Sequence, residues 1–197
     1  MPVLYFIRHG ETDWNVEQRL QGHRDTALNP RGRGQAGHCG AILRELLECN
    51  ARAAADCAFV SSPLVRARET MELVRAALAL DPRAYALDAR LIEIAFGEWE
   101  GLTLPEIQAR NPQALFERER DKWGFTPPGG ESYRALTERV GSWYGTITRD
   151  TVVTAHGGVA RGLIAHFNIL PHEEAVHADI VHGVVYVFAD GTMARHA

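Results

Sequence analysis

The sequence holds few cysteines and no long apolar run. Its 197 residues include three cysteines, and none of them forms a C-x-x-C pair. An odd number at these spacings is typical of reduced, mostly buried thiols in the cytoplasm and argues against a disulfide framework. The apolar residues at the start are too few for a signal-peptide core, and no stretch approaches the roughly 20 apolar residues of a membrane span. We therefore expect a cytoplasmic protein with no membrane partner.

Positive charge is also scarce. The chain carries 21 Lys and Arg against 25 Asp and Glu, a formal net charge of -4. A nucleic-acid partner therefore has no bulk electrostatic support, and attraction for phosphate must come from a local cluster of arginine and histidine. With 46% hydrophobic and 23% charged residues, the composition is that of a soluble globular protein. The length fits a single domain over residues 1–197, as a monomer or a homodimer.

Short apolar runs alternate with longer amphipathic stretches, which predicts an α/β domain with a mainly parallel sheet. We expect strands over residues 3–8, 57–61, 85–92, 151–155 and 184–188, and helices over residues 30–48 and 132–148. Two further helices should begin at Ser62-Pro63 and at His156. Residues 97–130 are expected to form an excursion over the active site. Asp190-Gly191 should form the turn of an antiparallel hairpin at the C-terminal edge.

The predicted strands end in residues that can handle an anion. Arg8 and His9 end the first strand, Arg66 comes just after the second, Glu93 follows the third and His156 the fourth. Because ligands of open parallel sheets bind outside the carboxyl ends of the strands, we expect these side chains to converge on one edge. The helix that begins after His156 should point its N–H groups at the same place.

This set of residues suits phosphoryl transfer. Two guanidinium groups can hold phosphate oxygens in a bidentate manner, and a neutral imidazole can attack phosphorus to give a phosphohistidine. Arg8 and Arg66 should disfavour protonation of His9, and a protonated His156 can stabilise charge on the phosphoryl oxygens. Glu93 can protonate the leaving alkoxide and then deprotonate the attacking water. We expect that a bound phosphate dianion makes Glu93 a competent acid.

Four segments together resemble the signatures of the histidine phosphatase superfamily, which includes the cofactor-dependent phosphoglycerate mutases. They are Arg8-His9-Gly10-Glu11-Thr12, Ser61-Ser62-Pro63-Leu64 with Arg66, Glu93 with Phe96-Gly97-Glu98-Trp99-Glu100-Gly101, and His156-Gly157-Gly158. The match spans nearly the whole chain in the family's order. The resemblance implies a three-layer α/β/α sandwich, with helices on both faces of the sheet, and chemistry that needs no metal.

The resemblance also implies roles for particular residues. His9 would be the phosphorylated nucleophile and Glu93 the proton donor, and the rest of the catalytic set would be Arg8, Arg66 and His156. The residues expected to bind phosphate and line its pocket are Arg8, Asn15, Gln21, Gly22, Arg66, His156 and Gly157. The substrate would be a small-molecule phosphate ester, and no cofactor would be required.

Three differences from the mutases favour a phosphatase. In the mutases the acidic residue is typically followed by Arg-His-Tyr, whereas Glu93 is followed by Ile94-Ala95-Phe96. The excursion is shorter than the mutase insertion, which carries paired arginines for the carboxylate of phosphoglycerate. The mutases commonly have a C-terminal tail that shields the phosphohistidine from water, whereas this sequence stops soon after the last hairpin. The differences also resemble the cobalamin-pathway phosphatases that act on α-ribazole phosphate, without specifying that substrate.

Two alternatives stay open. The first is a phosphoglycerate mutase-type isomerase, which would use 2,3-bisphosphoglycerate. The second is a catalytically inactive phosphate-binding module, although no catalytic position is substituted. Two other motifs are not expected to form functional sites. The G-x-G-x-x-G pattern at residues 32–37 follows the start of a helix, not a strand, and the two histidines of residues 172–177 are too far apart for a zinc-protease helix.

Overall fold

The computed structural model describes residues 2–197; Met1, the first residue of the expected 1–197 domain, lies outside the described residues. Within this range one six-stranded sheet has the order β3-β2-β4-β1-β5-β6. The strands are β1 (Leu4–Arg8), β2 (Ala58–Ser61), β3 (Ala86–Leu87), β4 (Thr151–Ala155), β5 (Val185–Ala189) and β6 (Thr192–His196). Strands β1 to β4 are parallel to one another, whereas β5 runs antiparallel to β1 and forms a hairpin with β6.

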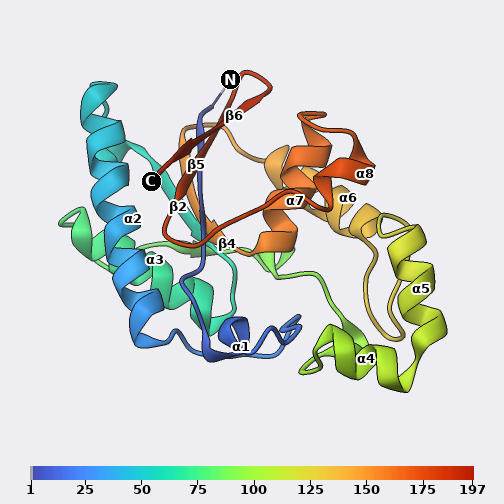
Figure 1. Ribbon diagram of the computed structural model, residues 1–197. Coiled ribbons are helices and arrows are strands. Elements are labelled where there is room, and N and C mark those ends of the chain that lie inside the picture. The colour runs from blue at the N-terminus through green and yellow to red at the C-terminus, as the bar shows by residue number, and fades with distance from the viewer. Residues whose placement is uncertain (1) are drawn as a thin grey trace.

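Helices cover both faces of this sheet (Figure 1). The α-helices are α1 (Asp13–Val16), α2 (Pro30–Cys49), α3 (Val65–Ala77), α4 (Leu104–Arg110), α5 (Pro112–Arg120), α6 (Tyr133–Tyr144), α7 (Gly157–His166) and α8 (His172–Ala175). Short 3-10 helices are η1 (Ala54–Asp56), η2 (Ala89–Leu91) and η3 (Gly97–Trp99). No helix within residues 2–197 is both long enough and apolar enough to cross a membrane.

The two-sided arrangement follows from the alternation of side chains along β1. Leu4 and Phe6 point to the face covered by α6 and α7, where they join one buried apolar cluster. Tyr5 and Ile7 point to the face covered by α2 and α3 and join a second cluster. The expected α/β/α sandwich with a mainly parallel sheet and an antiparallel C-terminal hairpin is confirmed.

The third predicted strand is wrong for most of its length. Only Ala86–Leu87 pairs with β2, in place of the expected residues 85–92. The chain leaves the sheet at Asp88, whose side chain accepts a hydrogen bond from the N–H of Arg90 (2.9 Å) and so caps the 3-10 helix η2. The alternation of apolar residues could not reveal this local cap, which competes with strand pairing.

The start of α3 also differs from the prediction. The helix begins at Val65, and Ser62 does not cap it. Instead the carboxylate of Asp25, from a distant segment, accepts the hydrogen bond from the Val65 N–H (2.7 Å). The Ser62 hydroxyl contacts the ring of His156, so it belongs to the site described below.

Other boundaries agree closely with the sequence. Asn29 caps α2 by accepting from the N–H of Gly32 (2.8 Å), directly before the helix starts at Pro30. Asp190 and Gly191 have φ angles of 49° and 72°, as a two-residue hairpin turn requires.

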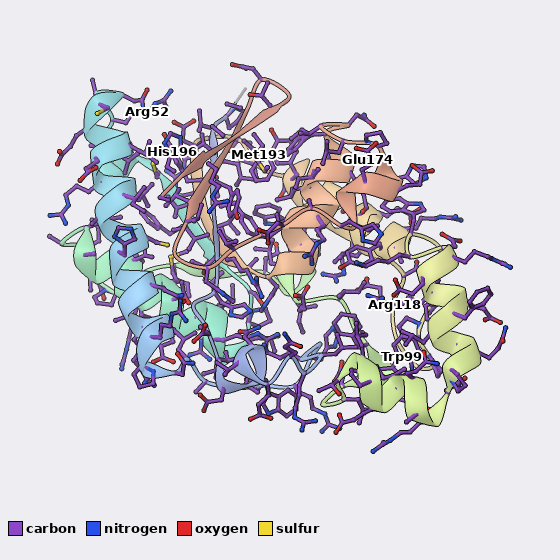
Figure 2. The ribbon with its side chains drawn as sticks, viewed as in Figure 1. Arg52, Trp99, Arg118, Glu174, Met193 and His196 are labelled. Carbon is purple, nitrogen blue, oxygen red and sulfur yellow. The ribbon has the colours of Figure 1, made fainter. Side chains whose placement is uncertain are left out.

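Residues 97–130 form a separate small cluster beside the sandwich. Trp99, Ile107 and Leu115 are buried together between η3, α4 and α5. Figure 2 shows Trp99 and Arg118 in this part of the molecule, on the far side of α7 from α2. Whether the segment closes over a bound substrate stays a prediction.

Candidate active site

The carboxyl ends of β1, β2 and β4 bring the predicted side chains to one edge of the sheet. His9 follows β1, and its N–H donates to the Ala155 carbonyl at the end of β4 (2.9 Å). His156 comes next after β4, and its ring centroid lies 5.2 Å from that of His9. Arg66, in the first turn of α3, is buried and acts electrostatically on both rings. These three side chains therefore form one cluster that is shielded from water.

A backbone contact fixes the tautomer of His9. Its Nδ1 lies 2.7 Å from the carbonyl oxygen of Gly10. Because a carbonyl oxygen can only accept, Nδ1 carries the proton and Nε2 keeps its lone pair in the neutral ring. The backbone here is tightly packed, since a Cβ on Gly10 would lie 2.2 Å from the carbonyl oxygen of Gly32. The chain thus presents Nε2 of His9 as the nucleophilic atom.

Burial and positive neighbours keep both histidines neutral. Burial is the largest cause that lowers the pKa of His9 well below 6.5, and Arg66 and Arg8 lower it further. Burial, followed by Arg66, likewise holds the pKa of His156 well below 6.5. The sequence predicts that Arg8 and Arg66 disfavour protonation of His9, and the lowered pKa of His9 agrees with that prediction. A protonated His156 needs a nearby anion, because a phosphate dianion would raise its pKa again.

A neutral His156 can still donate a hydrogen bond. Its Nε2 lies 2.7 Å from the Ser62 hydroxyl, which already accepts from the N–H of Leu64 (3.4 Å). When the Ser62 hydroxyl donates its hydrogen to Nε2, the proton of the neutral ring resides on Nδ1. The predicted phosphate contact of His156 would therefore be made by Nδ1–H.

Backbone carbonyls orient the two arginines. Arg8 donates from Nη1 to the carbonyl of Ile180. Arg66 donates from Nη1 to the carbonyl of Arg24 (2.8 Å) and from Nη2 to that of Gly22 (2.8 Å). Burial lowers the pKa of Arg8 to about 10, so it is still charged at neutral pH. Carbonyl partners hold the guanidinium planes without neutralising their charge.

Four buried nitrogen atoms around His9 have no hydrogen-bond partner within residues 2–197. They are Nε of Arg8, Nε of Arg66, Nδ1 of His156 and Nε2 of His182. A buried polar atom without a partner costs free energy, on the order of 1–3 kcal/mol each. An anion with several oxygens, such as a phosphoryl group, would satisfy several of these donors together.

Glu93 reaches the same edge from the segment between η2 and η3. Its Oε1 accepts from the N–H of Ile94 (2.9 Å) and from that of Gly158 (3.1 Å) in the first turn of α7. A Cβ on Gly158 would lie 2.3 Å from this oxygen, so glycine allows the contact. The carboxylate also acts electrostatically on Arg8 and Arg66, which places it beside the anion-binding cluster.

Arg139 of α6 holds the segment that carries Glu93. Its Nη1 donates to the carbonyls of Arg90 (2.6 Å) and Ile92 (3.0 Å). Its other nitrogens form a two-point ion pair with Glu131 (3.0 and 2.8 Å). Because β3 is short, the sheet does not hold the residues just before Glu93. The contacts of Arg139 hold them instead.

A cavity of about 210 Å³ opens at this edge. It is lined by Arg8, His9, Asn15, Gln18, Arg19, Leu20, Gln21, Gly22, Arg66, Glu93 and Phe96. The structure therefore brings Asn15, Gln21 and Gly22 to the cavity wall together with the predicted catalytic residues. His156 and Gly157 lie behind the wall. Gly157 packs against Arg8, whose Nε would be 3.6 Å from a Cβ at that position.

His182 is a residue of this site that the sequence reasoning missed. Its ring centroid lies 5.7 Å from that of His9, and its Nε2 is one of the unpartnered atoms. Burial, with Arg8 and Arg31 as further causes, lowers its pKa to about 3. The sequence does contain a signal for His182, because this residue comes just before β5. β5 runs antiparallel to β1, so the start of β5 lies beside the carboxyl end of β1.

The arrangement can bind a phosphoryl group, attack its phosphorus atom and exchange a proton with the leaving group. Among the described residues, no three His, Cys, Asp or Glu side chains gather in a way that could hold a metal ion. The reactive groups of the chain at this edge are an imidazole nitrogen, a carboxylate and guanidinium donors. Their roles in catalysis stay predictions from the sequence.

Comparison with known proteins places the chain in a family. The model for the histidine phosphatase superfamily (branch 1) matches residues 4–190. A bifunctional protein of Mycobacterium tuberculosis is 33% identical over 183 residues, which are 93% of this chain and 46% of that protein. The chain thus spans about half the length of this relative. A 2,3-bisphosphoglycerate-dependent phosphoglycerate mutase of Gloeobacter violaceus is 30% identical over 205 residues, covering 99% of this chain and 90% of the mutase.

Solved structures share the fold over nearly the whole chain. A mycobacterial glucosyl-3-phosphoglycerate phosphatase has a TM-score of 0.79 at 28% identity, with 94% of this chain and 89% of that chain covered. An α-ribazole phosphatase from Shigella flexneri has a TM-score of 0.81 at 24% identity, covering 98% and 94%, which is a likeness of fold.

Proposed function

The chain belongs to branch 1 of the histidine phosphatase superfamily, whose members are phosphatases or mutases, and on this basis we propose that it is a phosphatase of small molecules. It would hydrolyse a phosphomonoester through a phosphohistidine on His9, with Glu93 as proton donor and without a metal or cofactor. The solved phosphatase structure noted above supports the reaction class.

One observation carries the proposal: His9 presents Nε2 beside buried nitrogen atoms that have no hydrogen-bond partner within residues 2–197. Nδ1 of His9 is engaged by the Gly10 carbonyl, and unpartnered nitrogens of Arg8, Arg66 and His156 surround the ring. Positively charged and neutral donors in a buried site stabilise the negative charge of phosphoryl oxygens throughout transfer. A merely structural histidine would not need this surrounding set of unsatisfied donors.

In the first step Nε2 of His9 attacks phosphorus as the ester P–O bond breaks. Arg8, Arg66 and Nδ1–H of His156 would hold the phosphoryl oxygens. Glu93 would give its proton to the leaving alkoxide, so the products of this step are an alcohol and a phosphohistidine. The N–H of Gly158 holds the Glu93 carboxyl group at this edge of the sheet, where it can exchange a proton with the leaving alkoxide.

In the second step Glu93 would take a proton from water, and the water oxygen attacks phosphorus. The Nε2–P bond breaks, inorganic phosphate leaves, and His9 returns to its neutral form. Glu93 is then protonated and ready for the next ester. Each proton taken in one step is thus returned in the other.

The cavity wall favours hydrolysis over a mutase reaction. Phe96 supplies an aromatic wall in the segment that follows Glu93. Arg19, the lining arginine outside the phosphate cluster, is engaged by Glu106 (2.9 Å) and by Glu17 (2.7 Å). Among the lining residues no uncommitted cation is left for the carboxylate of a sugar acid. An uncharged leaving group with an apolar part fits this wall better.

The test is hydrolysis of p-nitrophenyl phosphate in EDTA, together with trapping of the phosphoenzyme. We expect turnover that EDTA does not reduce, and an acid-labile label on the wild type that His9→Ala lacks. Loss of activity in EDTA, restored by a divalent cation, would contradict the metal-independent mechanism. Absence of turnover with any phosphate ester would favour the inactive module.

The mutase relative justifies a second assay. Interconversion of 2- and 3-phosphoglycerate should be slower than ester hydrolysis and should not respond to 2,3-bisphosphoglycerate. Efficient interconversion that requires 2,3-bisphosphoglycerate would replace the phosphatase proposal with the mutase alternative.

A further inference from the structure

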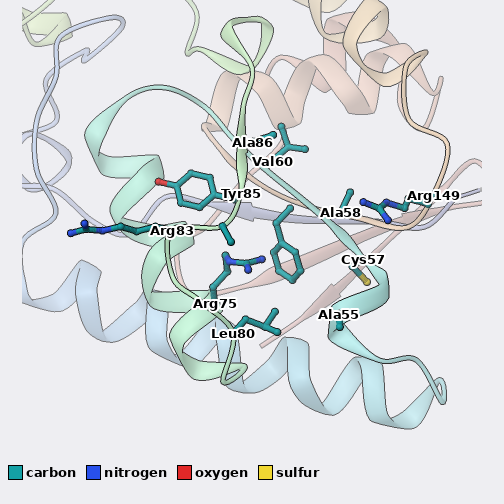
Figure 3. Close-up of a pocket in the computed structure, with 12 residues that line it drawn as sticks. Ala55, Cys57, Ala58, Val60, Arg75, Leu80, Arg83, Tyr85, Ala86 and Arg149 are labelled. Atoms are coloured by element: carbon teal, nitrogen blue, oxygen red, sulfur yellow. The ribbon is translucent and has the colours of Figure 1, made fainter.

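A second cavity, of about 640 Å³, lies at the β3 edge of the sheet (Figure 3). β3 pairs with β2 only at Val60 and Ser61, so in the described chain the first half of β2 has no strand on that side. The cavity occupies this position, between β2, the end of α3 and residues 80–86. We call it the edge cavity. It shares no lining residue with the catalytic cavity.

Every charged residue that lines the edge cavity is an arginine. The three are Arg75, Arg83 and Arg149, in a chain whose net charge is -4. The acids close by are not part of the lining; they are Asp56, Glu72, Asp81 and Asp150. Within residues 2–197 none of the three arginines forms an ion pair. The charged groups on the cavity wall itself are therefore all positive.

Arg75 is the buried member of this set, with only 6% of its surface exposed. Its guanidinium carbon lies 4.4 Å from the centre of the Phe59 ring, and its Nε donates to the Asp81 carbonyl (2.7 Å). The described residues offer no acceptor to its two terminal nitrogens. Burial lowers the pKa of Arg75, with Asp81 opposing the effect. An anion in the cavity would meet these terminal nitrogens and form charge-assisted hydrogen bonds with them.

The rest of the wall is apolar or aromatic. Phe59, Val60, Leu80 and Tyr85 form much of it, while Arg149 and Arg83 lie on opposite sides of Arg75 in Figure 3. The volume is in the range of small-molecule sites, which combine an apolar wall with a few placed polar groups. This combination calls for a ligand with both an anionic group and a flat apolar body.

We propose that the edge cavity binds a small organic anion in which a carboxylate or phosphate group is joined to an aromatic ring. Arg75 would hold the anionic group from inside the cavity, and Arg149 would supply a second charge at the rim. The ring would pack against Leu80 and Tyr85. The site is separate from the catalytic cavity and does not depend on the proposed hydrolysis.

A structural role alone leaves part of Arg75 unexplained. The Phe59 contact and the Asp81 bond join α3 to the sheet, but they use one face and one nitrogen of the guanidinium. A methionine could also pack against the Phe59 ring, through its sulfur, without burying a charge. If Arg75 had only a structural role, its substitution would change stability without changing ligand binding. If Arg75 holds the anion, its substitution should weaken binding.

The test is titration calorimetry with two probes, naphthalene-1-carboxylate and cyclic AMP. Cyclic AMP is a phosphodiester, so a phosphomonoesterase does not consume it. Both titrations are repeated on Arg66→Ala, which removes a donor of the catalytic cavity and should leave binding in the edge cavity unchanged. We expect at least one probe to bind with a Kd below about 1 mM, and the probe that binds identifies the preferred anionic group. Failure of both probes would overturn the proposal.

Three variants locate the binding. Arg75→Gln should weaken binding about tenfold and Arg149→Gln a few-fold, as expected for loss of a charge-assisted contact. Arg195→Gln removes one charge at the opposite, β6 edge and should bind as the wild type does. Thermal melting and p-nitrophenyl phosphate hydrolysis show that each variant is folded; if Arg75→Gln is not, Arg149→Gln carries the test. Wild-type binding by the folded cavity variants would overturn the site, as would loss of binding in Arg66→Ala.

Discussion

His9 combines a fixed proton, burial and two positively charged neighbours. The Gly10 carbonyl keeps the proton on Nδ1, and burial with Arg66 and Arg8 keeps the ring neutral. The same arginines that would bind the phosphoryl group thus also preserve the nucleophile. Their contribution to the transition state can be measured one side chain at a time.

Removal of the Arg66 guanidinium should slow catalysis strongly. Arg66→Ala deletes a buried donor beside the expected phosphoryl oxygens and should raise the barrier by about 3 kcal/mol, roughly a hundredfold in kcat. The measurement is steady-state hydrolysis of p-nitrophenyl phosphate. The control is Arg68→Ala, an exposed arginine on the same helix. Equal activity of Arg66→Ala and the wild type would remove Arg66 from the catalytic set.

His182 should contribute through its unpartnered Nε2. His182→Phe keeps an aromatic ring beside His9 but has no nitrogen, so we expect kcat to fall about tenfold, as for loss of one hydrogen bond to a charged group. His182→Asn keeps a polar group and should lose less. Rapid-quench measurement of phosphoenzyme formation separates this from an effect on product release. Wild-type phosphoenzyme formation by His182→Phe would show that its packing, not its nitrogen, matters.

At this scale the sequence reveals residues whose role follows from their place at a strand end. Arg8, His9 and His156 are predictable because each sits at the carboxyl end of a clear strand. Ser62 has no such signal: its role as partner of His156 depends on two segments that are far apart in the chain. Charge compensation and tautomers also depend on such contacts, so sequence alone cannot give them.

Among the elements, the first turn of α7 positions Glu93. Gly158→Ala would put a Cβ 2.3 Å from the Glu93 oxygen that its own N–H now binds. Displacement of the proposed acid should lower kcat at least about tenfold for esters with poor leaving groups and much less for p-nitrophenyl phosphate, whose leaving group needs little protonation.

A glycine elsewhere on the same helix is the control for this substitution. Gly162→Ala would place its Cβ at 3.5 Å from the nearest atom, an ordinary contact, so activity should be unchanged. Alkyl and p-nitrophenyl esters are compared for both variants. An equal loss on both substrates by Gly158→Ala would show general distortion of the site in place of a displaced acid.

The elements differ in how well the sequence predicts them. β1 and β4 are uninterrupted apolar runs between clear boundaries, and the hairpin turn at Asp190-Gly191 is specified by local conformation. The predicted third strand is too long because apolar residues after Leu87 pack in the core without pairing in the sheet. Leu91 is fully buried, yet it belongs to the 3-10 helix η2.

For the whole molecule, buried neutral histidines couple stability to pH. The pKa values of His9, His156 and His182 are all below the usual 6.5. Below pH 6.5 the unfolded chain binds protons that the folded chain does not, so the free energy of unfolding falls as pH falls. Each such histidine can contribute up to about 1.4 kcal/mol per pH unit, and for His182 the loss continues down to its folded pKa of about 3.

Urea unfolding at pH 7.5 and at pH 5.5 tests this coupling. The free energy of unfolding should be lower at pH 5.5, and His182→Asn should reduce the difference because it removes one of the titrating groups. Added phosphate should stabilise the folded state at both pH values by binding it selectively. Equal stability at the two pH values, or an unchanged difference in His182→Asn, would contradict the assignment of buried neutral rings.

The register of the C-terminal hairpin has a practical consequence for anyone who attaches a label to this chain. Val185 pairs with Ile7 on one side and with His196 on the other. β6 therefore ends level with the catalytic end of β1, two strands or about 10 Å to the side. A purification tag appended after Ala197 would leave the sheet on the same side as the catalytic residues, where a flexible oligohistidine could compete for anions. A tag joined before β1 would leave from the opposite end, so kinetic and surface-immobilisation work is better served by the N-terminal fusion.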